Sequence, residues 1–261
     1  MIRILDSKEF SEDASIHINF LEHVQKIFAP NGHLEQALGF EFRAEQAEMA
    51  KIYAASLVSG KHLIFEAGTG VGKSLAYLIP SILYARLTGR KCLIATNTIS
   101  LQEQLIEKDV PSVRDLFLRI CGMDSFAEFK CALLVGRANY LCQNRLHKAM
   151  MGQSDIFESN QRSDLQRIVE WVESGPKEGI RQEMLPSPNP LVWDSVNADS
   201  SVCSSKHCSP ENCYYRKARH LVENADLVII NHSLLFSLIG AGAGPSDERA
   251  GILFSDDFLV F

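Results

Sequence analysis

The chain has 261 residues, of which 46% are hydrophobic and 22% are charged. This length and composition suit one large α/β domain that carries an insertion, or two modest domains, each with a hydrophobic core. The net charge of -6 and the pI of 5.8 argue against a protein that coats duplex DNA through a broad basic face. They are compatible with a local channel that binds nucleic acid. The N-terminus shows no basic segment followed by an apolar stretch, so we expect a cytoplasmic protein.

Short apolar runs along the chain predict five strands, which are Leu63–Phe65, Cys92–Ala95, Cys131–Val135, Leu227–Ile230 and Phe258–Phe261. Helical patterns follow the first, second and fourth runs, which is typical of an α/β fold with a parallel sheet and crossover helices. The most hydrophobic stretch, Leu227–Ile239, is too short to span a bilayer comfortably and contains polar residues. We interpret it as a buried strand that runs into a helix, and we expect no membrane contact.

The long interval between the third and fourth strands, residues 136–226, does not keep this alternation and indicates an insertion. Its first part, residues 137–171, predicts helices, and the following glycines and prolines predict loops. A second glycine-rich segment at residues 240–245 predicts a loop by composition. The insertion is therefore expected to be mainly helical and to interrupt the sheet domain.

Residues 66–74, EAGTGVGKS, place a glycine-rich loop between an expected strand and a helix. Glycines let the backbone amides turn toward phosphates, and the helix N-terminus adds partial positive charge. Lys73 would reach the outer phosphates of ATP, and the Ser74 hydroxyl would bind Mg²⁺. The predicted phosphate-binding residues are Ala67, Gly68, Thr69, Gly70, Val71, Gly72, Lys73 and Ser74.

The chain has seven cysteines, an odd number that disfavours a disulfide framework. Three of them, Cys203, Cys208 and Cys213, are separated by four residues each, and Cys142 stands alone upstream. A zinc ribbon usually takes paired cysteines, so this spacing fits it poorly, whereas a 4Fe-4S cluster accepts wider and uneven spacing. Four unrelated thiols are the remaining alternative, although the polar sequence around the last three does not resemble a core.

The other three cysteines, Cys92, Cys121 and Cys131, lie in or beside apolar segments. We interpret them as packing residues rather than as ligands.

Four further segments, together with the phosphate loop, make the chain resemble the XPD/DinG family of iron-sulfur superfamily 2 DNA helicases, and within it the bacterial DinG-like branch. They are residues 43–46, 95–105, 136–142 and 225–232. The resemblance covers nearly the whole chain from about Ala29 onward. Ala67 replaces the first glycine of the general phosphate-loop pattern, and small residues there are familiar in superfamily 2 helicases.

This resemblance implies a RecA-like motor domain whose cofactors are ATP, Mg²⁺ and a 4Fe-4S cluster. It places Arg43 and Gln46 at the adenine side of ATP, where a glutamine amide can donate and accept hydrogen bonds. It places Thr96, Asn97 and Thr98 against the backbone of single-stranded DNA. Cationic and tyrosine side chains near the cysteines would form a groove for that strand: Arg137, Tyr140, Arg145, Lys148, Lys206, Tyr214, Tyr215, Arg216, Lys217 and Arg219.

By the same resemblance, a strand such as Phe258–Phe261 runs directly into an Asp-Glu-Ala-His box, and the sequence stops at Phe261. We therefore expect the N-terminal part of a helicase, with no catalytic residue of its own and inactive alone. Its expected parts are residues 1–135 of the first motor domain, an iron-sulfur insertion at 136–220, and a return to the motor at 221–261.

The expected function is that of a monomeric, ATP-dependent DNA helicase that moves 5' to 3' on single-stranded DNA. The alternative is a non-catalytic iron-sulfur module that binds DNA or senses redox state after loss of the motor. A small-molecule kinase would leave residues 96–105 and the four spaced cysteines unexplained.

Overall fold

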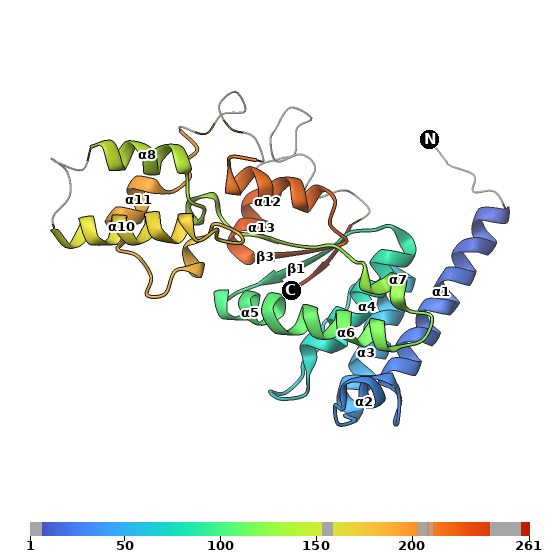
Figure 1. Ribbon diagram of the computed structural model, residues 1–261. Helices are drawn as coiled ribbons and strands as arrows, with labels where there is room; N and C mark the ends of the chain where they lie inside the picture. The colour runs from blue at the N-terminus through green and yellow to red at the C-terminus, as the bar shows by residue number, and fades with distance from the viewer. Residues whose placement is uncertain (1–6, 153–158, 202, 204–207, 209–210, 241–256) are drawn as a thin grey trace. The chain divides into compact units, whose positions relative to one another are not determined.

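The structure, a computed structural model, describes residues 7–152, 159–201, 203, 208, 211–240 and 257–261 (Figure 1). These residues form two compact units. The first holds the chain up to Cys131, residues Ala225–His232 and the described C-terminal residues, and the second holds Ala132–Asn224 and the segment from Ser233. The predicted loop at 240–245 lies almost wholly outside the described residues.

A four-stranded sheet with the order β2-β3-β1-β4 gives the chain its α/β fold. The central strand β1 pairs in parallel with β3 on one side and with β4 on the other, and its register sets Thr96 opposite Asn231. Every residue of β1 is buried, because helices cover a central parallel strand on both faces. The strands are β1 (Cys92–Thr96), β2 (Cys131–Leu134), β3 (Leu227–Asn231) and β4 (Phe258–Val260). The predicted RecA-like parallel sheet is confirmed, with four of its five strands.

The prediction of a fifth strand at Leu63–Phe65 is wrong. These residues adopt no regular structure, and the Ile64 side chain is 99% exposed. An apolar run becomes a strand only where a neighbouring strand offers its backbone groups, and none of the described strands pairs with this segment.

Helices of the first unit pack around one core, in which α3 contacts both α1 and α4 (Figure 1). The helix α4 is almost fully buried from Ala76 to Ala85, so the phosphate loop that precedes it is attached to a fixed element. The helical elements of this unit are α1 (Ser7–Phe28), α2 (His33–Leu38), α3 (Ala44–Ser59), α4 (Lys73–Thr88), α5 (Ile99–Gln104), the π-helical turn η1 (Leu105–Asp109), α6 (Val110–Arg119) and α7 (Asp124–Ala127).

Among the cysteines predicted to pack, Cys92 is buried in β1 and Cys131 is half-buried in β2. Cys121 is exposed, so its prediction as a packing residue is wrong. It follows α6, which ends at Arg119, and it precedes the turn at Gly122, where the chain lies at the surface.

Lys130 and Asp226 are hydrogen-bonded neighbours, although 95 residues separate them in the sequence. The Lys130 amide donates to Asp226 Oδ2 at 2.7 Å, and the Asp226 and Leu227 amides both donate to the Lys130 carbonyl at 2.9 and 3.0 Å. Arg86 adds an ion pair to Asp226 at 3.7 Å. The chain thus returns to the first unit at Ala225 beside the point where it leaves that unit after Cys131.

The second unit is mainly helical, as the insertion was expected to be, and it has a hydrophobic core of its own around Trp193. Its helical elements are η2 (Arg137–Asn139), α8 (Gln143–Met151), α10 (Ser159–Glu173), η3 (Arg181–Glu183), α11 (Pro190–Val196), α12 (Tyr214–Glu223) and α13 (His232–Gly240), of which α13 begins on the last residue of the first unit's segment. The predicted change from buried strand to helix at 227–239 is confirmed by β3 and α13.

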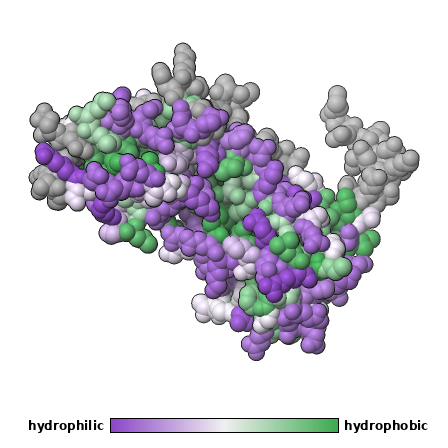
Figure 2. Space-filling model, viewed as in Figure 1, coloured by the Kyte–Doolittle hydropathy of each residue, from purple (hydrophilic) through white to green (hydrophobic). Residues whose placement is uncertain are grey.

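Hydrophilic residues cover most of the face seen in Figure 2. Among the described residues, no helix combines the length and the hydropathy needed to cross a membrane.

Candidate functional site

The phosphate loop ends where α4 begins. Gly72 takes a left-handed conformation with φ of 84° as the N-cap of α4, and Lys73 and Ser74 form the first turn. Backbone amides in a first turn have no helical partner, and the helix dipole adds positive potential there. The predicted phosphate-binding residues therefore lie at a site that is electrostatically suited to an anion.

The Lys73 ammonium group is enclosed by the loop. Its Nζ donates to the Ala67 carbonyl at 3.1 Å and to the Gly68 carbonyl at 2.6 Å. The loop therefore curls around its own lysine, and the two carbonyl oxygens hold the positive charge near the N-terminus of α4.

Arg43 and Gln46 contact the same loop from the start of α3. Arg43 Nη1 donates to the Gly70 carbonyl at 2.5 Å, and Gln46 Nε2 donates to the Gly72 carbonyl at 2.8 Å. The Gln46 side chain is only 5% exposed. A Cβ atom on Gly72 would lie 2.2 Å from Gln46 Nε2, so only glycine leaves room for this contact. The structure thus brings both predicted adenine-side residues to the phosphate loop.

The loop after β1 uses two of its three predicted DNA-contacting residues for its own structure. The Thr98 hydroxyl accepts a hydrogen bond from the Leu101 amide at 3.3 Å and caps α5, and the buried Thr96 hydroxyl donates to the Thr98 carbonyl at 3.2 Å. Asn97 is exposed. At the same edge of the sheet, His232 Nε2 lies 3.2 Å from the Ala95 carbonyl, so this histidine contacts backbone.

The sequence analysis missed two polar residues of the first unit, Tyr77 and Asp109. Burial raises the pKa of Tyr77 to about 12, the Ser74 side chain lowers it, and the Asp109 carboxylate raises it further. The signal was available, because helical spacing from Leu105 through Val113 places Asp109 on the buried face of its segment. A lone carboxylate on such a face indicates a function or a specific partner.

The four predicted cluster ligands lie in the second unit, and all four are half-buried. Burial is the main cause that raises the pKa of Cys203, Arg137 lowers it, and the nearby thiols of Cys142 and Cys208 raise it further. Burial likewise raises the pKa of Cys213, with further contributions from Cys208 and Cys203. The charges of these thiols thus affect one another. Among the described residues, however, no three His, Cys, Asp or Glu side chains are already arranged to hold a metal ion.

Two of these cysteines occupy helix N-termini. Cys142 is the N-cap of α8 and Cys213 is the N-cap of α12. Burial raises the pKa of Cys213, and the backbone amides of Arg216 and Tyr215 act against that effect.

Backbone pairing fixes the segment that carries Cys142. Tyr140 and Leu141 form isolated antiparallel bridges with Ile180 and Asn197, and the Cys142 amide donates to the Val196 carbonyl at 2.8 Å. Gly179, at a φ of 69°, lies so close to the Tyr214 ring that a Cβ atom there would come within 2.2 Å of it. The position of Cys142 is thus set by the core of the second unit.

Two residues of the predicted groove of cations and tyrosines, Tyr140 and Arg145, have contacts within the protein instead. The Tyr140 side chain is 1% exposed and cannot stack on a base, because its ring packs against Tyr215 in the interior. Arg145 is committed to the protein, with hydrogen bonds at 2.7 Å to the Asp194 carbonyl and to two oxygens of Asn197. Lys206 lies outside the described residues.

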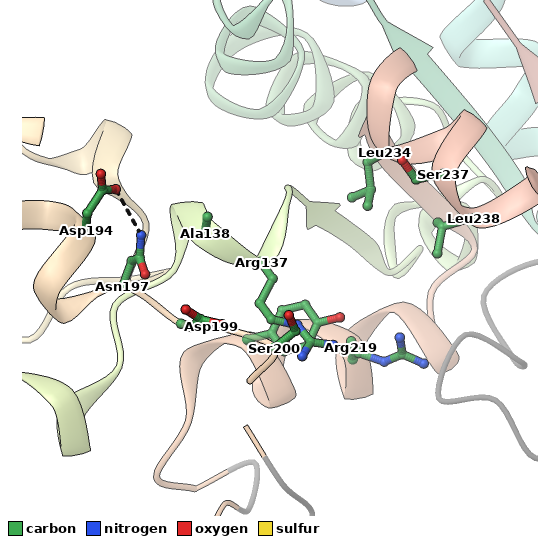
Figure 3. Close-up of a pocket in the computed structure, with 12 residues that line it drawn as sticks. Arg137, Ala138, Asp194, Asn197, Asp199, Ser200, Arg219, Leu234, Ser237 and Leu238 are labelled. Atoms are coloured by element: carbon green, nitrogen blue, oxygen red, sulfur yellow. Dashed lines mark hydrogen bonds between the residues drawn. The ribbon is translucent and has the colours of Figure 1, made fainter. Parts of the chain in front are cut away.

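Tyr215 and two arginines line a cavity of about 520 Å³ in the second unit (Figure 3). The Arg137 guanidinium lies 4.7 Å from the centre of the Tyr215 ring, and Arg219 lines the same cavity. Leu234 and Leu238 of α13 form an apolar side of it.

Comparison with known proteins agrees with these features. Residues 45–128 match the DEAD/DEAH box helicase family. The chain is 34% identical over 246 residues to the ATP-dependent DNA helicase YoaA of Haemophilus influenzae, which covers 92% of this chain and 36% of that protein. It is 34% identical over 213 residues to the ATP-dependent helicase DinG of Mycobacterium tuberculosis, which covers 76% of this chain and 31% of that protein. The resemblance to DinG-like helicases that the sequence predicts is confirmed over most of the chain.

A third DinG-like relative carries a different description. The 3'-5' exonuclease DinG of Bacillus subtilis is 28% identical over 199 residues, 76% of this chain and 20% of that protein. The chain spans about a third of the length of the two helicases. The match to the helicase family begins at Glu45 and includes the phosphate loop.

Proposed function

We propose that this chain is the ATP-binding and DNA-engaging part of an ATP-dependent DNA helicase that moves 5' to 3' on single-stranded DNA. ATP hydrolysis and strand separation belong to the whole protein, which we propose to act as a cytoplasmic monomer. Residues 1–261 alone should hydrolyse ATP negligibly.

The observation that carries the proposal is the convergence of Arg43, Gln46 and Lys73 on the loop at the N-terminus of α4. The loop amides and Lys73 would hold the phosphates, and Ser74 would bind Mg²⁺, which would offset their negative charge. Lys73 would exchange its two carbonyl contacts for phosphate oxygens, which accept stronger, charge-assisted hydrogen bonds.

We further propose that Cys142, Cys203, Cys208 and Cys213 hold a 4Fe-4S cluster. Four neighbouring thiols, two of them at helix N-termini, are a donor set of the kind this cluster takes. The cluster, when bound, would cross-link segments that are far apart in the sequence. The insertion would then extend over residues 136–220, between motor segments 1–135 and 221–261.

Single-stranded DNA would contact the exposed Asn97 after β1, at the edge of the sheet where ligands of open α/β folds bind. A non-catalytic iron-sulfur module is disfavoured, because such a module would have no use for Lys73, Arg43 and Gln46 gathered at a phosphate loop.

Calorimetry with Mg²⁺-ADP tests the nucleotide site. Lys73→Ala should weaken binding by at least about 100-fold, since two charge-assisted hydrogen bonds contribute about 1.5–3 kcal/mol each. Lys61→Ala removes an exposed lysine just before the loop and should bind like the unsubstituted chain. Equal affinity in Lys73→Ala and Lys61→Ala would refute the site.

A further inference from the structure

Gly70 and Gly72 are the two residues of the phosphate loop that adopt a left-handed conformation, with φ of 83° and 84°. Glycine takes this conformation without steric strain, but it also samples many others, so a glycine-rich loop loses much backbone entropy when it is fixed. Contacts that hold such a loop in one conformation before its ligand arrives lower the free-energy cost of binding. The affinity of the loop for phosphates should therefore depend on what holds these two glycines.

Two side chains from the start of α3 hold the carbonyl groups of these same glycines. Arg43 Nη1 donates to the Gly70 carbonyl at 2.5 Å, and Gln46 Nε2 donates to the Gly72 carbonyl at 2.8 Å. Arg43 is the N-cap of α3, and Gln46 lies in the first turn of that helix. Because α3 packs against α4 and Gly72 is the N-cap of α4, the loop is held between two helices that pack together.

Gln46 is enclosed at this position. It is 5% exposed, and a Cβ atom built on Gly72 would lie 2.2 Å from its Nε2 and 3.1 Å from its Cδ. A glutamine that reads an adenine edge must offer both its amide donor and its carbonyl acceptor to the base. The Gln46 donor is instead directed to the backbone of the loop.

We propose that Gln46 and Arg43 are positioning residues that fix the phosphate loop, and that they strengthen the binding of phosphates whatever base the nucleotide carries. The proposal rests on the nucleotide site proposed above. It gives the two side chains a role different from the adenine contact that the family resemblance implies. Left-handed residues in a turn let successive backbone amides face one anion, so holding Gly70 and Gly72 keeps the loop in a conformation suited to phosphate.

The test compares three ligands in the presence of Mg²⁺: ADP, GDP and pyrophosphate, which has no base. Gln46→Met keeps the length of the side chain and removes its amide. This substitution should weaken the binding of all three ligands by the same factor, about three- to tenfold, which corresponds to one hydrogen bond. Calorimetry measures ADP and GDP directly, and pyrophosphate by its displacement of ADP.

Arg43→Ala should weaken the binding of all three ligands about two- to fivefold, because the Arg43 side chain is exposed and water competes for its contact. Gln36→Met is the matched control. Gln36 is exposed, and its amide also donates to a backbone carbonyl, that of Asn31 at 2.6 Å, which lies outside the loop. The control should bind all three ligands like the unsubstituted chain.

A double variant gives a second readout. The methyl group of Gly72→Ala would displace the Gln46 amide, so Gln46→Met in that background removes a hydrogen bond that is already lost. The loss of ADP affinity in the double variant should therefore be smaller than the sum of the two single losses. Additive losses would overturn the proposal.

A loss confined to ADP would also overturn the proposal, since it would identify Gln46 as a reader of adenine. Affinities in Gln46→Met equal to those in Gln36→Met for all three ligands would overturn it too. Lys73→Ala separates this proposal from the nucleotide site on which it rests. If Lys73→Ala binds all three ligands normally, the nucleotide site itself is wrong. If Lys73→Ala loses binding while Gln46→Met and Arg43→Ala bind normally, the site stands without these positioning residues.

Discussion

The phosphate loop and the cysteine region differ in what holds their functional groups. In the loop, Lys73, Arg43 and Gln46 each donate to a backbone carbonyl of the loop itself. In the cysteine region the thiols are gathered, yet burial and the neighbouring thiols raise the pKa of Cys203 and Cys213. The contacts of the first region are made within the protein, whereas burial in the second favours the neutral thiol of Cys203 and Cys213.

Because of this difference, we expect the two regions to respond differently to the loss of nucleotide and of iron. Thiolates repel one another, so four of them stay together only where positive charge offsets the repulsion. Arg137 and two helix N-termini supply part of that charge, and we expect iron to supply the rest. Removing nucleotide should leave the first unit folded, whereas removing iron should loosen the second.

The largest expected effect is a complete loss of iron on Cys213→Ser. The substitution removes a proposed ligand, so iron and acid-labile sulfide should disappear and amide exchange in the second unit should accelerate, while ADP affinity stays unchanged. Cys121→Ser, an exposed cysteine in the first unit, is the control and should keep its iron. Full iron content in Cys213→Ser, or stoichiometric zinc in the unsubstituted chain, would contradict the assignment.

Gly179→Ala should destabilise the second unit selectively. Its Cβ would come within 2.2 Å of the Tyr214 ring, and such overpacking costs about 1–3 kcal/mol in free energy of unfolding. Gly175→Ala is the matched control, because Gly175 has a similar φ of 75° and open space around it. Urea unfolding followed by tryptophan fluorescence measures the difference, since Trp171 and Trp193 both lie in the second unit. Equal midpoints for the two variants would rule out the clash.

Gly72→Ala makes the corresponding test in the first unit. The new methyl group would displace the Gln46 amide and remove its hydrogen bond to the loop, at a cost of about 1 kcal/mol. We expect a similar loss of Mg²⁺-ADP affinity, measured by calorimetry. Gly70→Ala has the same strain, with φ of 83°, but meets no neighbour. If Gly70→Ala lowers the Mg²⁺-ADP affinity as much as Gly72→Ala does, the contact between Gln46 and the loop does not contribute to nucleotide binding.

The smallest expected effect is a gain in stability on Gln102→Leu. Gln102 is 2% exposed, and its Nε2 has no hydrogen-bond partner among the described residues. An unsatisfied buried donor costs about 1–3 kcal/mol, so leucine should raise the free energy of unfolding by about 1 kcal/mol. Urea unfolding followed by circular dichroism measures it, with Gln36→Leu on the exposed side of α2 as a control expected to gain nothing. A clear loss of stability in Gln102→Leu would show that the amide is satisfied after all.

The central strands were predictable from the sequence because β1 and β3 are continuous apolar runs, buried on both faces. The segment Leu63–Phe65 has the same appearance and is not a strand, since pairing depends on what lies beside a segment in space. Local composition carries no information about that neighbour.

The candidate site was predictable in its parts. The loop, Arg43, Gln46 and the four cysteines stand out by residue type and spacing. Contacts between these parts could not be predicted from the sequence. The hydrogen bond from Gln46 to Gly72, for example, joins residues 26 positions apart and depends on how α3 packs against α4. For the same reason Tyr140 could not be distinguished from Tyr215 as a surface ring until the interior was known.

The hydrogen bonds between Lys130 and Asp226 have a consequence for the evolution of a protein of this architecture. These hydrogen bonds hold together the two ends of the segment that lies between the two residues, so the length of that segment adds little to the entropy of closing the sheet. Only the edge strand β2 lies at the exit point, and the central pairing of β1 with β3 lies behind it. A change in the length of this segment should therefore leave the pairing of β1 with β3 intact, so evolution can lengthen or shorten the segment without rebuilding the sheet.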